Sequence, residues 1–149
     1  MSEDPIRMVD VSGKEVVHRT ATASGKIKLK KTTIKAIKEA GIKKGDPLTV
    51  GEIAAILAVK KTPELIPLCH NIPIGKVDVE YRLTDDAVEA FCTVVTNAQT
   101  GVEMEALTGV TVALLNIWDM TKYLEKDEDG QYPDTAISDI HVVEKRKGE

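Results

Sequence analysis

The sequence predicts an α+β fold in which helices pack on one face of a mostly antiparallel sheet. Apolar and polar residues alternate over 77–83 and again over 88–95, and the polar residues 84–86 between them form a turn, which predicts a β-hairpin. Residues 102–124 are apolar at mixed helical spacings, as in a helix that is buried on several sides. Strand-like segments flank these elements, and such a series favours one two-layer domain.

The first third of the chain begins with residues 1–12, which we expect to form a flexible arm. Residues 16–23 are rich in threonine and valine and predict a strand. Ile27 and Leu29 alternate with lysines, which favours a second strand segment without excluding a helix. Apolar residues recur at helical spacing over 33–40, and Gly41 stands where a C-cap glycine is expected.

The next segment opens with a turn at 44–47, because lysine, glycine, aspartate and proline follow one another there. Thr49 and Glu52 match a capping box, which predicts a helix start. Pro63 ends that helix, and the proline-containing residues 66–71 form an irregular loop.

The last part of the chain predicts a polar loop over 125–134, a final strand over 137–143 and a mobile tail over 145–149. No internal repeat or linker interrupts residues 1–149, so we expect a single domain.

Composition excludes several classes of protein. A net charge of -4 argues against a protein that binds nucleic acid through one broad basic face. The two cysteines, Cys69 and Cys92, lack metal-ligand spacing and cannot make a disulfide framework. No apolar run is long enough for a transmembrane helix, and residues 1–5 carry two acids and no apolar run, so we do not expect them to form a signal peptide. We therefore expect a cytoplasmic protein without membrane partners.

Common catalytic motifs are missing as well. The chain has no dinucleotide-binding glycine motif and no complete P-loop, since Thr20 replaces the first glycine and Ile27 follows Gly25-Lys26. It also has no H-E-x-x-H, G-x-S-x-G or paired C-x-x-C motif.

Two places nevertheless carry reactive residue types. Cys69 and His70 lie between Pro67 and Pro73, where no regular helix forms; an imidazole there can carry a proton near neutral pH, although a buried cysteine beside an incidental histidine is the more ordinary interpretation. Glu103 and Glu105 open the long helix, where the helix dipole alone favours carboxylates.

Asp119 and Lys122 lie three residues apart on one face near the end of the same helix. Such a pair is often a weak surface ion pair. The apolar turn 114–118 before it instead favours a partly buried lysine that transfers protons.

The length of this helix limits the site. Glu103 and Asp119 are 16 residues apart, which places them about 24 Å apart on a straight helix. Residues so far apart cannot meet on one small substrate within one chain, so we expect a site at a subunit interface.

The N-terminal third is locally basic, and most of its lysines are expected to be solvated. Lys44 differs because it lies in the glycine–proline turn, and Lys60 and Lys61 differ because they end a helix just before the Cys-His loop. Any of these three could contact phosphate.

Four segments carry a family resemblance: 8–12 (MVDVS), 65–70 (LIPLCH), 101–107 (GVEMEAL) and 119–122 (DMTK). Together they resemble the cyclic pyranopterin monophosphate synthase family, the molybdenum cofactor biosynthesis protein C family, over residues 8–145.

This resemblance implies a lyase that converts (8S)-3',8-cyclo-7,8-dihydroguanosine 5'-triphosphate to cyclic pyranopterin monophosphate and releases diphosphate. It implies a ferredoxin-like subunit in a homo-hexamer, a trimer of dimers, with sites between subunits. It implies no required cofactor and no resident metal, and leaves open whether Mg²⁺ accompanies the triphosphate.

The resemblance also implies roles for individual residues. Asp119, Lys122 and Lys44 match catalytic positions, with the lysines acting as acid and base through lowered pKa values. The matching substrate-binding positions are Leu68, Cys69, His70, Glu103, Met104 and Glu105. The C-terminal end is shorter and poorer in glycine than in many family members, so Lys145 is left outside the expected site.

Two other interpretations stay open. His70, Glu103 and Glu105 could be ligands of a divalent metal in a binding or regulatory module. Alternatively, the polar residues could satisfy the interface of a non-catalytic oligomeric scaffold.

Overall fold

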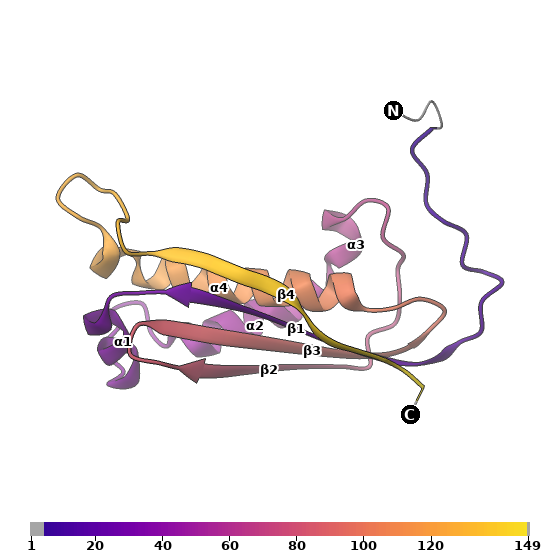
Figure 1. The fold of residues 1–149 in the computed structure, drawn as a ribbon, viewed down its shortest axis with the longest axis horizontal. Helices are drawn as coiled ribbons and strands as arrows, with labels where there is room; N and C mark the ends of the chain where they lie inside the picture. The colour runs from indigo at the N-terminus through magenta and orange to yellow at the C-terminus, as the bar shows by residue number, and fades with distance from the viewer. Residues whose placement is uncertain (1–4, 149) are drawn as a thin grey trace.

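A computed structural model describes residues 5–148 and places four strands and four helices along the chain (Figure 1). The elements are β1 (Val17–Lys28), α1 (Lys31–Lys38), α2 (Pro47–Lys60), α3 (Thr62–Leu65), β2 (Lys76–Leu83), β3 (Ala87–Ala98), α4 (Glu103–Glu125) and β4 (Ala136–Lys147).

The strands form one sheet in the order β2-β3-β1-β4, and every neighbouring pair is antiparallel. Helices α2 and α4 cover one face of this sheet (Figure 1). This order, with one helical connection between β1 and β2 and another between β3 and β4, is the ferredoxin-like arrangement, so the predicted fold class is confirmed.

Strand alternation decides which face of the sheet is covered. In β3, every second side chain faces the helices and is fully buried: Val88, Ala90, Cys92 and Val94. Three side chains of α4 pack in the same core and are equally buried: Val110, Leu114 and Ile117. The opposite face of the sheet is polar, and there the hydroxyls of Thr22 and Thr93 pair across β1 and β3 at 2.7 Å.

A buried carboxylate ties the end of α4 to two other segments. Glu125 is 0% exposed and accepts hydrogen bonds from the Thr33 hydroxyl, from the Thr135 hydroxyl at 2.6 Å and from the Lys30 backbone N–H at 3.1 Å. Thr33 lies in the first turn of α1, and Thr135 directly precedes β4. A buried carboxylate needs such donors to offset its desolvation, so this carboxylate fixes where α4 ends.

Strand β1 differs from the prediction of two separate segments, because it runs unbroken from Val17 to Lys28. Ser24 and Gly25 obscure the alternation in the sequence, and opposite them the pairing with β4 changes register. A Cβ atom on Gly25 would lie 2.9 Å from side-chain atoms of both Ile140 and Leu114. Glycine is needed here because neighbouring side chains approach the backbone closely.

The start of α2 also differs from the sequence analysis. Helix α2 begins at Pro47, and its N-cap is Asp46, whose side chain accepts from the Leu48 N–H at 3.0 Å. The expected capping box at Thr49 and Glu52 is therefore wrong, and the Thr49 hydroxyl donates to Asp46 instead, at 2.7 Å.

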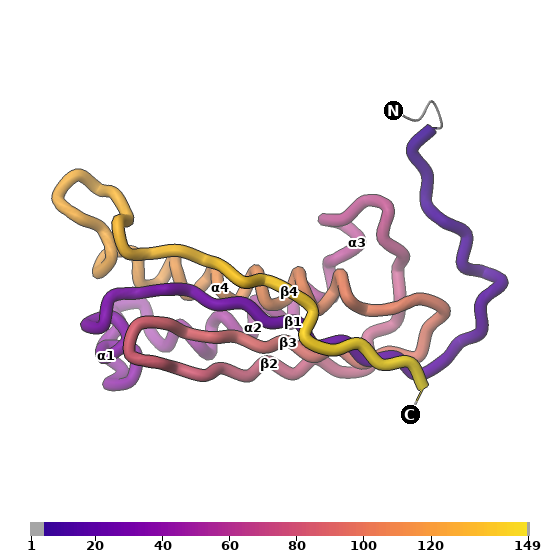
Figure 2. The backbone as a smooth tube through the Cα atoms, in the orientation of Figure 1, coloured from indigo at the N-terminus to yellow at the C-terminus, as the bar shows by residue number. Residues whose placement is uncertain are grey.

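The C-terminal strand is longer than predicted. Strand β4 continues to Lys147, so residues 145–147, assigned to the tail, pair with β1. Residues 5–12 of the expected arm contain no helix or strand (Figure 2). Residues 1–4 of the arm and residue 149 of the tail lie outside the described residues. No helix between residues 5 and 148 is long and apolar enough to cross a membrane.

Helix α1 ends one residue earlier than the position of Gly41 suggested. Ala40 adopts the left-handed conformation, with φ of 55°, that glycine usually supplies after a helix. The Gly41 N–H donates to the Ala36 carbonyl at 2.8 Å and the Ala40 N–H to the Ile37 carbonyl at 3.2 Å, which is the Schellman pattern. Gly41 is thus the second residue beyond the cap.

We expect Ala40→Gly to stabilise the fold by about 0.5–1 kcal/mol, because glycine adopts positive φ without the Cβ clash that alanine suffers. Chemical denaturation at one fixed protein concentration measures this free energy of unfolding. The matched change Ala36→Gly, inside the same helix, should destabilise by about the same amount. Destabilisation by both changes would contradict the cap assignment.

Candidate active site

The predicted site residues fall into two groups at opposite ends of α4. The helix runs without a break from Glu103 to Glu125. Glu103 and Glu105 therefore lie in its first turn, whereas Asp119 and Lys122 lie about 24 Å further along, as the sequence analysis expected. Within this chain the two ends do not converge.

The first group, here the lysine–aspartate group, consists of Lys44, Asp119 and Lys122. The Lys122 ammonium lies 3.0 Å from Oδ1 of Asp119, and the Lys44 ammonium lies 3.3 Å from Oδ2. Lys44 comes from the turn before α2, so residues 75 positions apart in the chain meet at one carboxylate. One carboxylate between two ammonium ions leaves a net positive charge, which suits an anionic ligand.

Charges within this group perturb its pKa values. Hydrogen bonds and charge attraction from Lys122, and then from Lys44, lower the pKa of Asp119. The bond to Asp119 raises the pKa of Lys122, whose side chain is 41% exposed. The expected lowered pKa of a partly buried Lys122 is therefore wrong for the single chain, because solvent and Asp119 both favour its charged form.

The second group, here the thiol–carboxylate group, consists of Cys69 and Glu105. The Cys69 thiol donates to Oε2 of Glu105 across 3.7 Å. Glu105 is only 1% exposed, and among the described residues its Oε1 has no hydrogen-bond partner. Burial raises the pKa of Glu105, and burial together with the Glu105 charge raises the pKa of the Cys69 thiol. A buried oxygen without a donor suits a ligand that carries an N–H or O–H.

The neighbours of this group make different contacts. Nε2 of His70 lies 2.6 Å from the backbone carbonyl of Val9, so the N-terminal arm reaches the Cys-His loop. Oε2 of Glu103 pairs with the Lys145 ammonium at 3.3 Å. Lys145 is a residue that the sequence analysis left out, because residues 144–147 are all charged and show no alternation; its pairing with Ala21 places it on the helix-covered face.

Leu68 and Met104 lie at the surface near the thiol–carboxylate group, 45% and 40% exposed. Met104 borders an apolar hollow of about 330 Å³ formed with residues of α3, α4 and the segment between α3 and β2: Leu65, Ile66, Leu107, Thr108, Thr111 and Val112.

The metal-module interpretation finds no geometric support. Across residues 5–148, no three His, Cys, Asp or Glu side chains gather in a way that could hold a metal ion. His70 contacts a backbone carbonyl instead, and Glu103 contacts Lys145.

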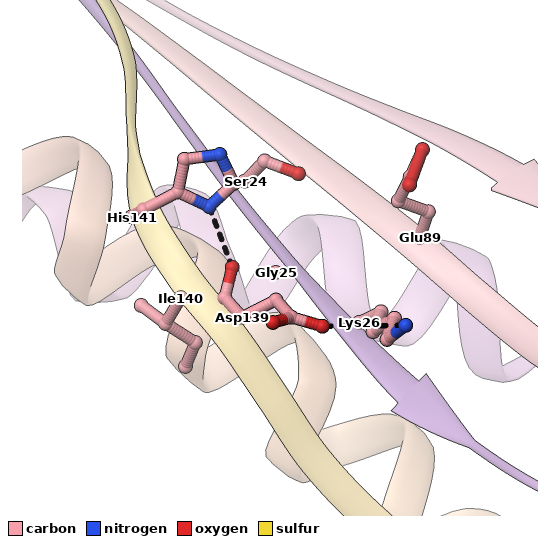
Figure 3. A pocket seen from close by; sticks show the side chains of 7 residues that line it. All are labelled: Ser24, Gly25, Lys26, Glu89, Asp139, Ile140 and His141. Atoms are coloured by element: carbon pink, nitrogen blue, oxygen red, sulfur yellow. Dashed lines mark hydrogen bonds and ion pairs between the residues drawn. The ribbon is translucent and has the colours of Figure 1, made fainter.

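A separate hollow of about 380 Å³ lies on the polar face of the sheet, with the helices behind it (Figure 3). The Lys26 ammonium there pairs with Asp139 at 3.2 Å, and Nδ1 of His141 lies 2.6 Å from the Asp139 carbonyl oxygen. It contains none of the predicted site residues, and its remaining carboxylate, Glu89, pairs with Arg82 at 3.4 Å.

Glu105 makes the stability of the fold depend on pH. Its pKa is higher in the folded chain than in the unfolded one, so its favourable contribution is complete below the unfolded pKa and is lost as the pH rises through the folded pKa. We expect Glu105→Gln to gain stability relative to the unchanged chain from about pH 4 upward. Denaturation curves at several pH values measure this difference, with Glu64→Gln as a control for loss of an exposed carboxyl. A difference that shrinks with rising pH would contradict the burial of this carboxylate.

Comparison with known proteins adds an independent observation. The chain is 58% identical to the "Probable cyclic pyranopterin monophosphate synthase" of Thermococcus kodakarensis over 100% of this chain and 96% of that protein. It is 60% identical to the protein of the same name from Aeropyrum pernix over 95% and 97%. The "Probable cyclic pyranopterin monophosphate synthase accessory protein" of Methanothermobacter thermautotrophicus is 59% identical over 97% and 91%.

The model of the MoaC family matches residues 8–148, which include both groups of site residues and every helix and strand of the fold. With a match of this extent, the chain belongs to the MoaC family.

Proposed function

We propose that the chain is a cyclic pyranopterin monophosphate synthase of molybdenum cofactor biosynthesis. It converts (8S)-3',8-cyclo-7,8-dihydroguanosine 5'-triphosphate to cyclic pyranopterin monophosphate and releases diphosphate. The observation that carries this proposal is the lysine–aspartate group, in which two ammonium ions share one carboxylate. Family membership and the names of the relatives support cyclic pyranopterin monophosphate as the product, and the resemblance supplies the substrate and the diphosphate.

The lysine–aspartate group suits the phosphate end of this substrate. Ring closure on the innermost phosphorus forms a bond to a sugar oxygen and breaks the bond to diphosphate, so negative charge grows on the leaving oxygens. Lys122 and Lys44 are placed to neutralise that charge, and Asp119 holds both ammonium ions together. With its raised pKa, Lys122 stays protonated and acts through its positive charge rather than as a base.

The thiol–carboxylate group suits the ring end. A guanine-derived ring presents N–H groups, and Oε1 of Glu105 is a buried acceptor without a donor of its own. Cys69, His70, Glu103, Leu68 and Met104 would surround the same ring.

Both ends of the substrate are needed at once, so we propose that two subunits share each site. The two groups lie about 24 Å apart along α4, which exceeds the reach of a single nucleotide-sized ligand. Exposed apolar side chains on the helix layer support association, because Ile53 and Leu57 of α2 and Leu115 of α4 are 55%, 52% and 53% exposed. A hexamer built from three dimers is the assembly that we propose.

Further parts of the proposal concern cofactors and location. The reaction involves no redox step and needs no resident cofactor, although Mg²⁺ can accompany the triphosphate. We place the enzyme in the cytoplasm, and its partners are the small-molecule substrate and its own subunits. Assays in Mg²⁺ and in EDTA measure the metal requirement.

The experiment that tests the function follows diphosphate release from the enzymatically prepared cyclised triphosphate and identifies the product by mass spectrometry. We expect Lys122→Ala to lower kcat by roughly 10²–10³-fold, the usual effect of removing one group that stabilises charge in the transition state. Lys126→Ala, four residues further along, removes a charge outside the group and is the matched control.

No diphosphate release by a folded, oligomeric preparation would refute the proposed reaction and favour the scaffold interpretation. Full activity of Lys122→Ala would leave the reaction in place and remove Lys122 from its catalytic role.

Mixing two inactive variants tests whether subunits share the site. Lys122→Ala and Glu105→Ala damage opposite ends of α4, so in a mixed dimer one of the two shared sites receives both intact ends. After subunit exchange we expect about a quarter of the unmodified activity to return, because half of the randomly formed dimers are mixed. Recovery that stays at zero despite mass-spectrometric proof of exchange would place each site within one chain.

A further inference from the structure

Lys44 lies in a tight β-turn whose outer peptide groups need partners. The Gly45 N–H donates to the Ile42 carbonyl at 3.1 Å, which makes Lys43 and Lys44 the two central residues of the turn. Gly45 has φ of +118°, a conformation that only glycine adopts readily. In such a turn the N–H of the first central residue points outward and makes no bond within the turn, so Lys43 offers a free donor.

The hydroxyl of Tyr123 accepts this donor. The Lys43 N–H lies 2.9 Å from Oη of Tyr123, and the Lys43 ammonium lies over the same ring, 5.2 Å from its centre. Tyr123 directly follows Lys122 on α4. One tyrosine therefore connects the peptide beside Lys44 to the helix that carries Asp119.

Other contacts fix the ends of the turn, whereas at its middle the contact of the Lys43 ammonium with the Tyr123 ring involves a flexible side chain and does not hold the backbone. Ile42 is 6% exposed and anchors the start of the turn in the core. Asp46 anchors the residues after the turn, because it caps α2. The Lys44–Asp119 ion pair joins two side chains that are 52% and 56% exposed, and exposed pairs restrain a flexible lysine only weakly.

We propose that Tyr123 is a positioning residue for Lys44: its hydroxyl holds the Lys43 amide, and this keeps the Lys44 ammonium within reach of Asp119. The inference rests on the proposed function, in which both lysines act on the departing diphosphate. Tyr123 touches neither the substrate nor the reacting atoms in this role.

The hydrogen bond between the Lys43 N–H and the Tyr123 hydroxyl lies at the surface, so we expect its loss to affect turnover rather than the stability of the fold. When the hydroxyl is removed, water can take its place at the Lys43 N–H, so folding loses little. Water does not tie the turn to α4, however, and the lysine then spends less time beside Asp119. Misplacement of a charged group costs more in the transition state than in substrate binding.

The test is Tyr123→Phe, with Tyr81→Phe as its matched control. Both changes remove one hydroxyl and keep the ring, but Oη of Tyr81 is buried without a hydrogen-bond partner among the described residues. We expect Tyr123→Phe to lower kcat roughly threefold to tenfold, the effect of one hydrogen bond, with KM and the melting temperature nearly unchanged. Tyr81→Phe should leave kcat unchanged.

Two NMR measurements read the positioning without turnover. Hydrogen exchange at the Lys43 amide should accelerate in Tyr123→Phe and not in Tyr81→Phe. The pKa of the Asp119 carboxyl, which Lys122 and then Lys44 hold low, should move toward its ordinary value in Tyr123→Phe, with Lys44→Ala as the reference for complete loss of that contact.

The outcomes separate the two proposals. An unchanged Asp119 titration or an unchanged kcat in Tyr123→Phe overturns the inference about Tyr123. Absence of turnover by the unmodified protein refutes the proposed reaction, and the Asp119 titration then still decides whether Tyr123 places Lys44.

Discussion

The arrangement of the molecule depends on one long, unbroken helix, α4, which keeps the two groups of site residues apart. Helix α4 has 23 residues and so spans about 34 Å, and its buried side chains pack on the sheet along most of that length. The bonds of Glu125 to Lys30, Thr33 and Thr135 hold its last turn against α1 and the entry to β4. Because the helix is rigid and fixed, side chains at its two ends stay apart.

Two buried carboxylates on this helix differ in their hydrogen bonds, and the difference separates a structural role from a ligand-binding one. Glu125 is as buried as Glu105, but both of its oxygens accept hydrogen bonds from backbone or hydroxyl donors. Glu105 has one weak thiol donor and one oxygen without a partner, and burial raises its pKa. A fold tolerates the cost of such an unpaired group where a ligand supplies the missing donor.

The sequence predicted those parts whose signal is periodic or local. The β2–β3 hairpin and α4 follow from alternation and from helical spacing, and Asp119 and Lys122 are neighbours on any helix. The contact between Lys44 and Asp119 could not be predicted from the sequence, because the two residues are 75 positions apart. The family resemblance had assigned both to the site only by analogy. Ser24 and Gly25 interrupt the alternation of β1 and so hid its unity. Residues 144–147 are all charged and hid the length of β4, so Lys145 was assigned to a tail although it pairs with Glu103. Tyr123 gave no signal, because its contact is to a backbone amide.

The two carboxylates of the proposed site have pKa values moved in opposite directions, and this divides the chemistry between them. Two ammonium ions lower the pKa of Asp119, so it stays charged and orients lysines rather than accepting protons. Burial raises the pKa of Glu105, which makes it the stronger base once it is ionised. Lys122 is kept protonated by Asp119, and an incoming triphosphate favours that charge further. In the proposed reaction the phosphate end therefore supplies fixed positive charge and the ring end supplies a proton acceptor, and a substrate that bridges two subunits would connect them.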